Sequence, residues 1–81
     1  MKPDLSEILQ NLRSIEEDMD VPRNIRAKVK GTIELLTTDG EMELKIDKSL
    51  ETLGEVADDP TVPQHTRMVV WSLVSQLETQ K

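Results

Sequence analysis

The sequence contains an internal repeat, and this repeat constrains the fold more than any other feature of the chain. Four residues of the first half recur after a displacement of 41 residues, so that Asp18, Val21, Pro22 and Arg26 become Asp59, Val62, Pro63 and Arg67. The flanking apolar residues follow the same displacement and are spaced by three and four, which is typical of one helix face. Because a repeat fixes architecture, each half is interpreted as two helices joined by a tight Val-Pro turn.

The repeat predicts an all-α fold in a single domain. Short connections between helices favour antiparallel neighbours. We therefore expect an up-down-up-down four-helix bundle that spans residues 1–81 and is built from two αα-hairpins, about 4–38 and 41–79. In this topology both Val-Pro turns lie at the same end of the bundle. The expected helices cover about residues 5–19, 22–36, 41–57 and 62–79.

Three polar residues are predicted to cap the helices. Asp4 is followed three residues later by Glu7, which is the spacing of a capping box. Asp20 and Thr61 occupy equivalent positions of the repeat, each just before a Val-Pro pair. Either side chain can accept a hydrogen bond from a first-turn amide, so we expect them to cap the second and fourth helices.

Composition excludes several classes of protein. The net charge of −6 argues against nucleic-acid binding through a general electrostatic field, and Trp71 is the only aromatic residue, which removes a stacking platform for bases. The chain has no cysteine and a single histidine, so we expect no metal site and no cofactor. No apolar stretch is long enough to span a membrane. These properties predict a cytoplasmic protein without catalytic activity.

Three apolar residues of the fourth helix lie outside its predicted core stripe. Met68 and Trp71 project more than about 100° from the centre of that stripe, and Val69 lies between them in sequence. A helix that is apolar on two faces is either central in its fold or covered by a partner. Either a partner surface or a skewed bundle that buries Trp71 explains the pattern. The equivalent residues of the second helix are Ala27, Lys28 and Lys30.

Charged residues gather at the end of the bundle where both Val-Pro turns are expected. Asp18, Asp59, Arg26 and Arg67 repeat there and could form a site for a small ligand or ion. The alternative is structural: the acids cap helices and pair with the arginines, whose stems lie along the edge of the core.

Two segments carry a resemblance to a known family. Residues 18–26 (DMDVPRNIR) and, more specifically, residues 58–78 (DDPTVPQHTRMVVWSLVSQLE) resemble the uncharacterised protein family numbered 0147, a group of small archaeal proteins. The chain departs from the family pattern at Thr61 and Val62, where Asn and Met are usual. The resemblance implies a cytosolic archaeal protein with a bromodomain-like four-helix bundle, and it implies no activity. An acetyl-lysine pocket needs aromatic lining, and this chain has no Tyr or Phe.

Together these patterns predict a small, non-catalytic helical interaction module. We expect it to self-associate, most simply as a twofold homodimer, or to dock a protein partner through Met68, Val69 and Trp71. The alternative hypothesis is a ligand-binding or ion-binding protein with its site at the Val-Pro turn end. The sequence identifies neither the partner nor the biological process.

Overall fold

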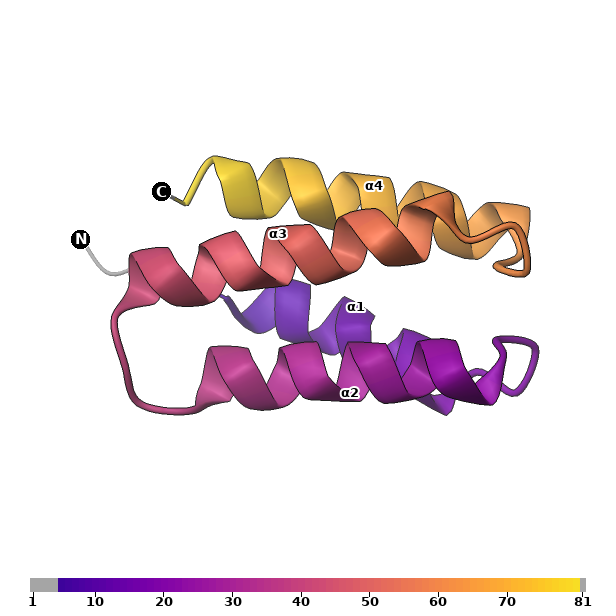
Figure 1. Ribbon diagram of the computed structural model, residues 1–81, viewed down its shortest axis with the longest axis horizontal. Coiled ribbons are helices and arrows are strands. Elements are labelled where there is room, and N and C mark those ends of the chain that lie inside the picture. Colours follow the sequence, from indigo (N-terminus) through magenta and orange to yellow (C-terminus); the bar gives the residue numbers. More distant parts are fainter. Residues whose placement is uncertain (1–4, 81) are drawn as a thin grey trace.

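The computed structural model describes residues 5–80, which form four antiparallel helices and contain no β-strand. Figure 1 shows the up-down-up-down order, with both Val-Pro turns at one end of the bundle and the loop between the second and third helices at the other. This confirms the predicted all-α fold with an up-down-up-down four-helix bundle. The helices are α1 (Ser6–Glu17), α2 (Arg23–Thr37), α3 (Met42–Asp58) and α4 (Gln64–Glu78).

Each helix contributes one apolar stripe to a single core. Consecutive helices pack against one another, and α1 also contacts α4, which closes the bundle. The turn valines Val21 and Val62 are buried beneath the two Val-Pro turns. Both turns are therefore anchored in the core, which fixes where the polar groups of the turn end are presented. The fully buried anchors of the four helices include Leu12, Val29, Leu53 and Leu73.

Both Val-Pro turns differ from the predicted capping arrangement. Pro22 and Pro63, and not Asp20 and Thr61, are the N-cap residues, and no cap uses a side-chain hydrogen bond. The prolines have ψ angles of 147° and 148°, which are extended and not helical. α2 and α4 therefore begin at Arg23 and Gln64, one or two residues later than the sequence predicts. The predicted cap at Asp4 lies outside the described residues.

The core contains a buried hydroxyl group, and we expect its removal to stabilise the protein. Ser49 is 0% exposed, and its Oγ has no hydrogen-bond partner within residues 5–80. Its equivalent in the first repeat is Ile8, which is apolar and buried. Because an unsatisfied buried hydroxyl is costly, Ser49→Ala should raise the free energy of unfolding by about 1 kcal/mol. Urea denaturation measures this change. A lower midpoint for the variant would instead indicate that the hydroxyl has a partner in solution.

Candidate functional site

The three apolar residues singled out on α4 lie at the surface. The exposed fractions of Met68, Val69 and Trp71 are 64%, 37% and 48%. About half of the Trp71 side chain therefore remains accessible in the isolated bundle, which differs from the alternative of a tryptophan buried in a skewed core. We refer to these three residues as the α4 face.

The α4 face covers the outer side of α4 from one neighbouring helix to the other. Arg67 donates from Nη2 to the carbonyl oxygen of Asp59 at the end of α3, at 3.0 Å. Trp71 follows Arg67 by four residues, so it lies on the same flank of α4, toward α3. Val69 lies on the opposite flank, where it lines a cavity of about 160 Å³ between α1 and α4. Met68 projects outward between these two flanks.

The arginines of the turn end bind backbone oxygens. Arg26 Nε donates to the carbonyl oxygen of Val21 at 3.0 Å, and Arg67 donates to the carbonyl oxygens of Asp59 and Val62. Within residues 5–80 neither arginine has a carboxylate oxygen within 4.0 Å, so the structural alternative holds in a different form: the arginines tie down backbone oxygens of the turns. The reason is geometric: each turn directs carbonyl groups toward the helix that follows it, within reach of an arginine in the first turns of that helix.

The aspartates of the turn end accept hydrogen bonds from the turns themselves. Asp18 Oδ1 accepts from the amide of Asp20 at 2.9 Å, and Asp59 Oδ1 accepts from the amide of Thr61 at 2.8 Å and from its hydroxyl at 2.6 Å. The other Asp18 oxygen lies 3.7 Å from His65 Nε2. The structure thus brings the four predicted residues to one end of the bundle, where they hold the two turns in shape.

The Asp59 carboxylate gives a testable pH dependence. The Thr61 hydroxyl and amide, with smaller effects from Lys28 and Arg67, lower the pKa of Asp59 below its usual value of 3.8. Because the folded pKa is lower than the unfolded one, the ionised group stabilises the fold above about pH 4. This contribution is lost as the pH falls through the folded pKa. We expect Thr61→Val to raise the Asp59 titration midpoint, measured by NMR of the carboxyl carbon. An unchanged midpoint would contradict the role of the hydroxyl.

The described residues contain neither a metal-binding cluster nor a membrane-spanning helix. Within residues 5–80 there is no group of three or more His, Cys, Asp or Glu side chains arranged to hold a metal ion. In the same part of the chain, no helix has the length and apolar character needed to cross a membrane.

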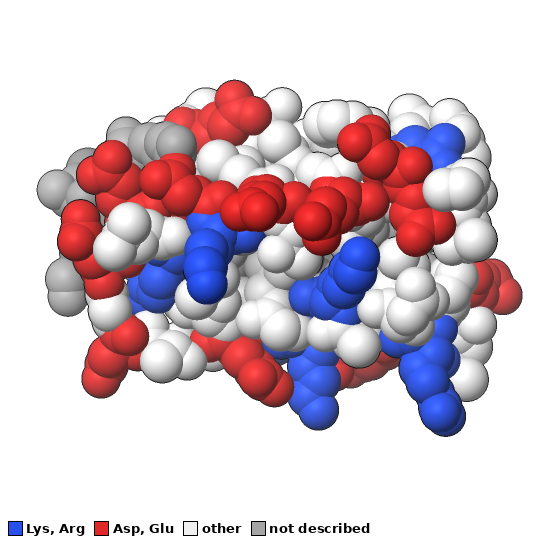
Figure 2. Space-filling model, in the orientation of Figure 1, with Lys and Arg blue, Asp and Glu red and all other residues white. Residues whose placement is uncertain are grey.

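The structure reveals an acidic feature that the sequence reasoning missed. Exposed acids recur along α3 at spacings of three and four residues, and Figure 2 shows them as a band along this helix. The spacing of these acids in the sequence could have predicted this feature, because residues three and four apart share a helix face. The equivalent described positions of α1 are mostly neutral: Ser6, Gln10 and Ser14. We call the feature the α3 acidic ridge: Glu43, Asp47, Glu51, Glu55 and Asp58.

Comparisons with known proteins give one consistent result. Residues 1–80 match the profile of a family described as "Uncharacterised protein family (UPF0147)". A UPF0147 protein of Methanosarcina mazei is 41% identical over 76 residues, covering 93% of this chain and 82% of the relative. A UPF0147 protein of Archaeoglobus fulgidus is 39% identical over 77 residues, covering 95% and 88%.

Solved structures agree with the sequence comparisons. A crystal structure of a protein from the uncharacterised family UPF0147 of Thermoplasma acidophilum is 28% identical. It superposes with a TM-score of 0.90 and covers 95% of this chain and 92% of the other. A second crystal structure, of a protein of unknown function, is 35% identical with a TM-score of 0.88, covering 100% and 98%. The four-helix arrangement is thus shared with these proteins.

Proposed function

The chain belongs to the uncharacterised protein family UPF0147, and we propose that it is a small, non-catalytic interaction module that docks a protein partner through the α4 face. The observation that carries this proposal is the exposure of Met68, Val69 and Trp71 on one helix. Tryptophan and methionine are enriched at protein interfaces, where a few such residues supply most of the binding energy. A cytoplasmic location remains a prediction.

The internal repeat supports this proposal by providing a natural control. At the positions equivalent to Met68 and Trp71, α2 has Ala27 and Lys30 on the same scaffold of turns and core residues. The first hairpin therefore folds without an apolar outer face, so the bundle does not need one for its own stability. An apolar surface that the fold does not require is explained by contact with another protein.

The alternative function, a ligand or ion site at the turn end, receives less support. The carboxylates of Asp18 and Asp59 and the guanidinium groups of Arg26 and Arg67 already form hydrogen bonds within the two turns. A ligand would have to displace these bonds, which would cost the stability that they contribute. We therefore propose the docking function in preference.

Position-specific crosslinking in the native host tests the docking function. A photoreactive amino acid would replace Met68 or Trp71 in one set of strains and Ala27 or Lys30 in the control set. We expect a crosslinked product above the 9.2 kDa chain only from the first set. A product of twice that mass would identify a second copy as the partner. Absence of any product, or equal yields from both sets, would reject the docking function.

The fold should tolerate a change at the centre of the α4 face. Trp71→Lys introduces the residue that the repeat already carries at Lys30. Because Trp71 is 48% exposed, we expect the free energy of unfolding to change by less than about 1 kcal/mol, with the helical circular dichroism retained. Unfolding of the variant would assign Trp71 to the core and would count against a role in docking.

A further inference from the structure

We propose that the partner of the α4 face is a basic amphipathic segment, whose Lys and Arg side chains contact the α3 acidic ridge while its apolar side chains cover Met68 and Trp71. This inference rests on the proposed docking function and adds the chemistry of the partner. It follows from the position of the ridge, the position of Trp71, and the charge that a covering surface must carry.

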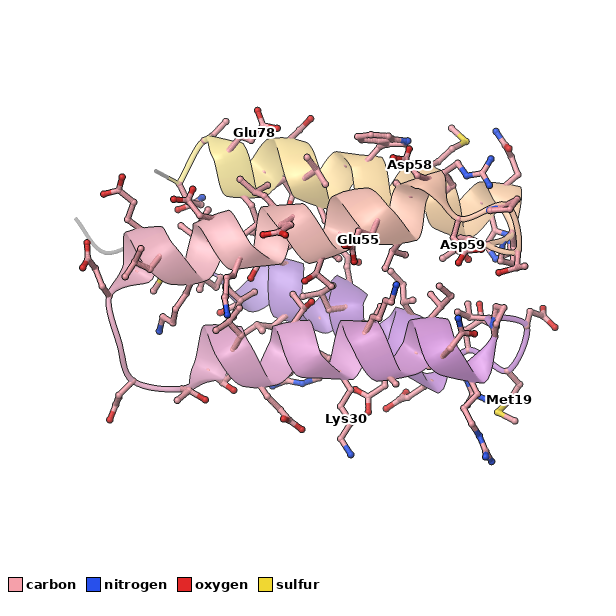
Figure 3. All side chains as sticks on the ribbon, viewed as in Figure 1. Met19, Lys30, Glu55, Asp58, Asp59 and Glu78 are labelled. Carbon is pink, nitrogen blue, oxygen red and sulfur yellow. The ribbon has the colours of Figure 1, made fainter. Side chains whose placement is uncertain are left out.

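The C-terminal end of the α3 acidic ridge lies beside the α4 face (Figure 3). The flank of α3 toward α2 is marked by two contacts: Lys45 Nζ donates to the carbonyl oxygen of Thr38, and Glu55 lies 3.7 Å from Lys28. Helical geometry places Asp58 about 60° from Glu55, on the side away from Lys45 and toward α4. Figure 3 shows Asp58 at the edge between α3 and α4.

Exposed acids of α3 and α4 lie on the side of the bundle that carries Trp71 (Figure 3). Glu78 follows Trp71 by seven residues, two helical turns along the same flank of α4, and Figure 3 shows it near the C-terminal end of that helix. Antiparallel packing places the middle of α4 beside the second half of α3, because Arg67 meets Asp59 where α3 ends. The second half of α3, which carries Glu51 and Asp58, therefore lies beside the part of α4 that carries Trp71. Glu51, Asp58 and Glu78 are all exposed.

This arrangement selects the charge of the partner. An apolar centre bordered by polar groups is the usual anatomy of a protein interface. The cation on this flank of α4, Arg67, already donates to the carbonyl oxygens of Asp59 and Val62, which leaves the exposed carboxylates to select the partner. A neutral or acidic partner would desolvate or repel these carboxylates, whereas Lys and Arg side chains would pair with them. A cation that pairs with Asp58, at the edge between α3 and α4 (Figure 3), can also approach the indole face of Trp71, where the ring attracts it.

A second copy of the chain fits this surface less well than a basic segment. In a twofold dimer the same patch lies on both sides of the interface, so a dimer that buries the α4 face and the α3 acidic ridge would bring two sets of carboxylates into one interface. Each chain also carries a net charge of −6, and this like charge opposes association at low ionic strength.

Titration with a defined peptide pair tests the charge of the partner. The probe is a synthetic amphipathic helical peptide with Lys and Arg on one face and Leu on the other, and the control peptide has Glu in place of the basic residues. Trp71 is the only tryptophan of the chain, so its fluorescence reports contact at the α4 face directly. We expect the basic peptide to shift this emission and the acidic peptide to leave it unchanged.

Two protein variants with the same change in charge locate the contact. Glu51→Gln with Asp58→Asn and Glu78→Gln removes three exposed acids of α3 and α4. Glu7→Gln with Glu17→Gln and Glu34→Gln removes three exposed acids elsewhere. At low salt we expect the first variant to weaken binding of the basic peptide by about tenfold, and the second by less than about threefold.

The outcomes separate this inference from the function on which it rests. Equal weakening in the two triple variants, or no fluorescence response to the basic peptide, would overturn the basic partner. The crosslinked product from positions 68 and 71 could also persist in the first triple variant, or have twice the mass of the chain. Either result would overturn the basic partner while the docking function stands. Loss of the crosslinked product in the first triple variant but not in the second would support the inference.

Discussion

Leu53→Ala is expected to lower the free energy of unfolding by about 3 kcal/mol. Leu53 is 0% exposed in the middle of α3 and packs in the single core of the bundle. Its truncation removes buried apolar surface and leaves a cavity that neighbouring side chains fill only in part. A domain of this length has a total stability of about 4 to 12 kcal/mol, so the variant should be close to unfolding at elevated temperature.

Leu44→Ala provides the matched control on the same helix. Leu44 is 63% exposed, so the same chemical change removes little buried surface. Urea denaturation followed by circular dichroism should show a much lower midpoint for Leu53→Ala and a nearly unchanged midpoint for Leu44→Ala, with similar slopes. Equal shifts for the two variants would contradict the position of the core described above.

Arg67→Ala is expected to lower the free energy of unfolding by about 2 kcal/mol. The guanidinium group joins the carbonyl oxygens of Asp59 and Val62, so it ties the second Val-Pro turn to the start of α4. Truncation to Ala leaves these oxygens without their charged donor and removes the packing of the arginine stem. Arg67→Lys keeps the charge but not the forked donor geometry, and we expect it to recover only part of the loss.

The same variant distinguishes a structural arginine from a ligand-binding one. If Arg67 held a ligand, that ligand would raise the melting temperature of the unaltered protein. Arg67→Ala would then abolish this rise and leave the stability of the ligand-free protein unchanged. We expect the opposite result in thermal melts with inorganic phosphate and with Mg²⁺. Arg67→Ala should melt earlier than the unaltered protein under every condition, and neither ion should shift the melting temperature of the unaltered protein.

The sequence was sufficient to predict the fold because local and global patterns agree. The segment from Asp18 to Arg26 recurs as the segment from Asp59 to Arg67, and this repeat predicted two helical hairpins. The spacing of the apolar residues predicted the buried face of each helix. The starts of α2 and α4 were misplaced because proline is tolerated both within the first turn and at the cap, and only the extended ψ angle of Pro22 and Pro63 distinguishes the two positions.

The candidate site was only partly predictable, and the reasons are physical. Residue identity does not show where a turn directs its carbonyl groups, so the partners of Arg26 and Arg67 were assigned to carboxylates. The exposure of Trp71 depends on how the helices are rotated about their axes, which periodicity leaves open. The α3 acidic ridge was readable from its spacing, but its position beside Trp71 required the packing of α3 against α4.

The central claim is that a partner covers the α4 face in the cell. Labelling of introduced cysteines in living cells tests this claim most directly. The chain has no cysteine, so Met68→Cys and its repeat equivalent Ala27→Cys each provide one exposed thiol and leave Trp71 in place. In dilute purified protein we expect a membrane-permeant maleimide to label both positions at similar rates. In the native host, labelling at position 68 should be slower than at position 27. The same ratio of rates in cells and in dilute solution would contradict the claim.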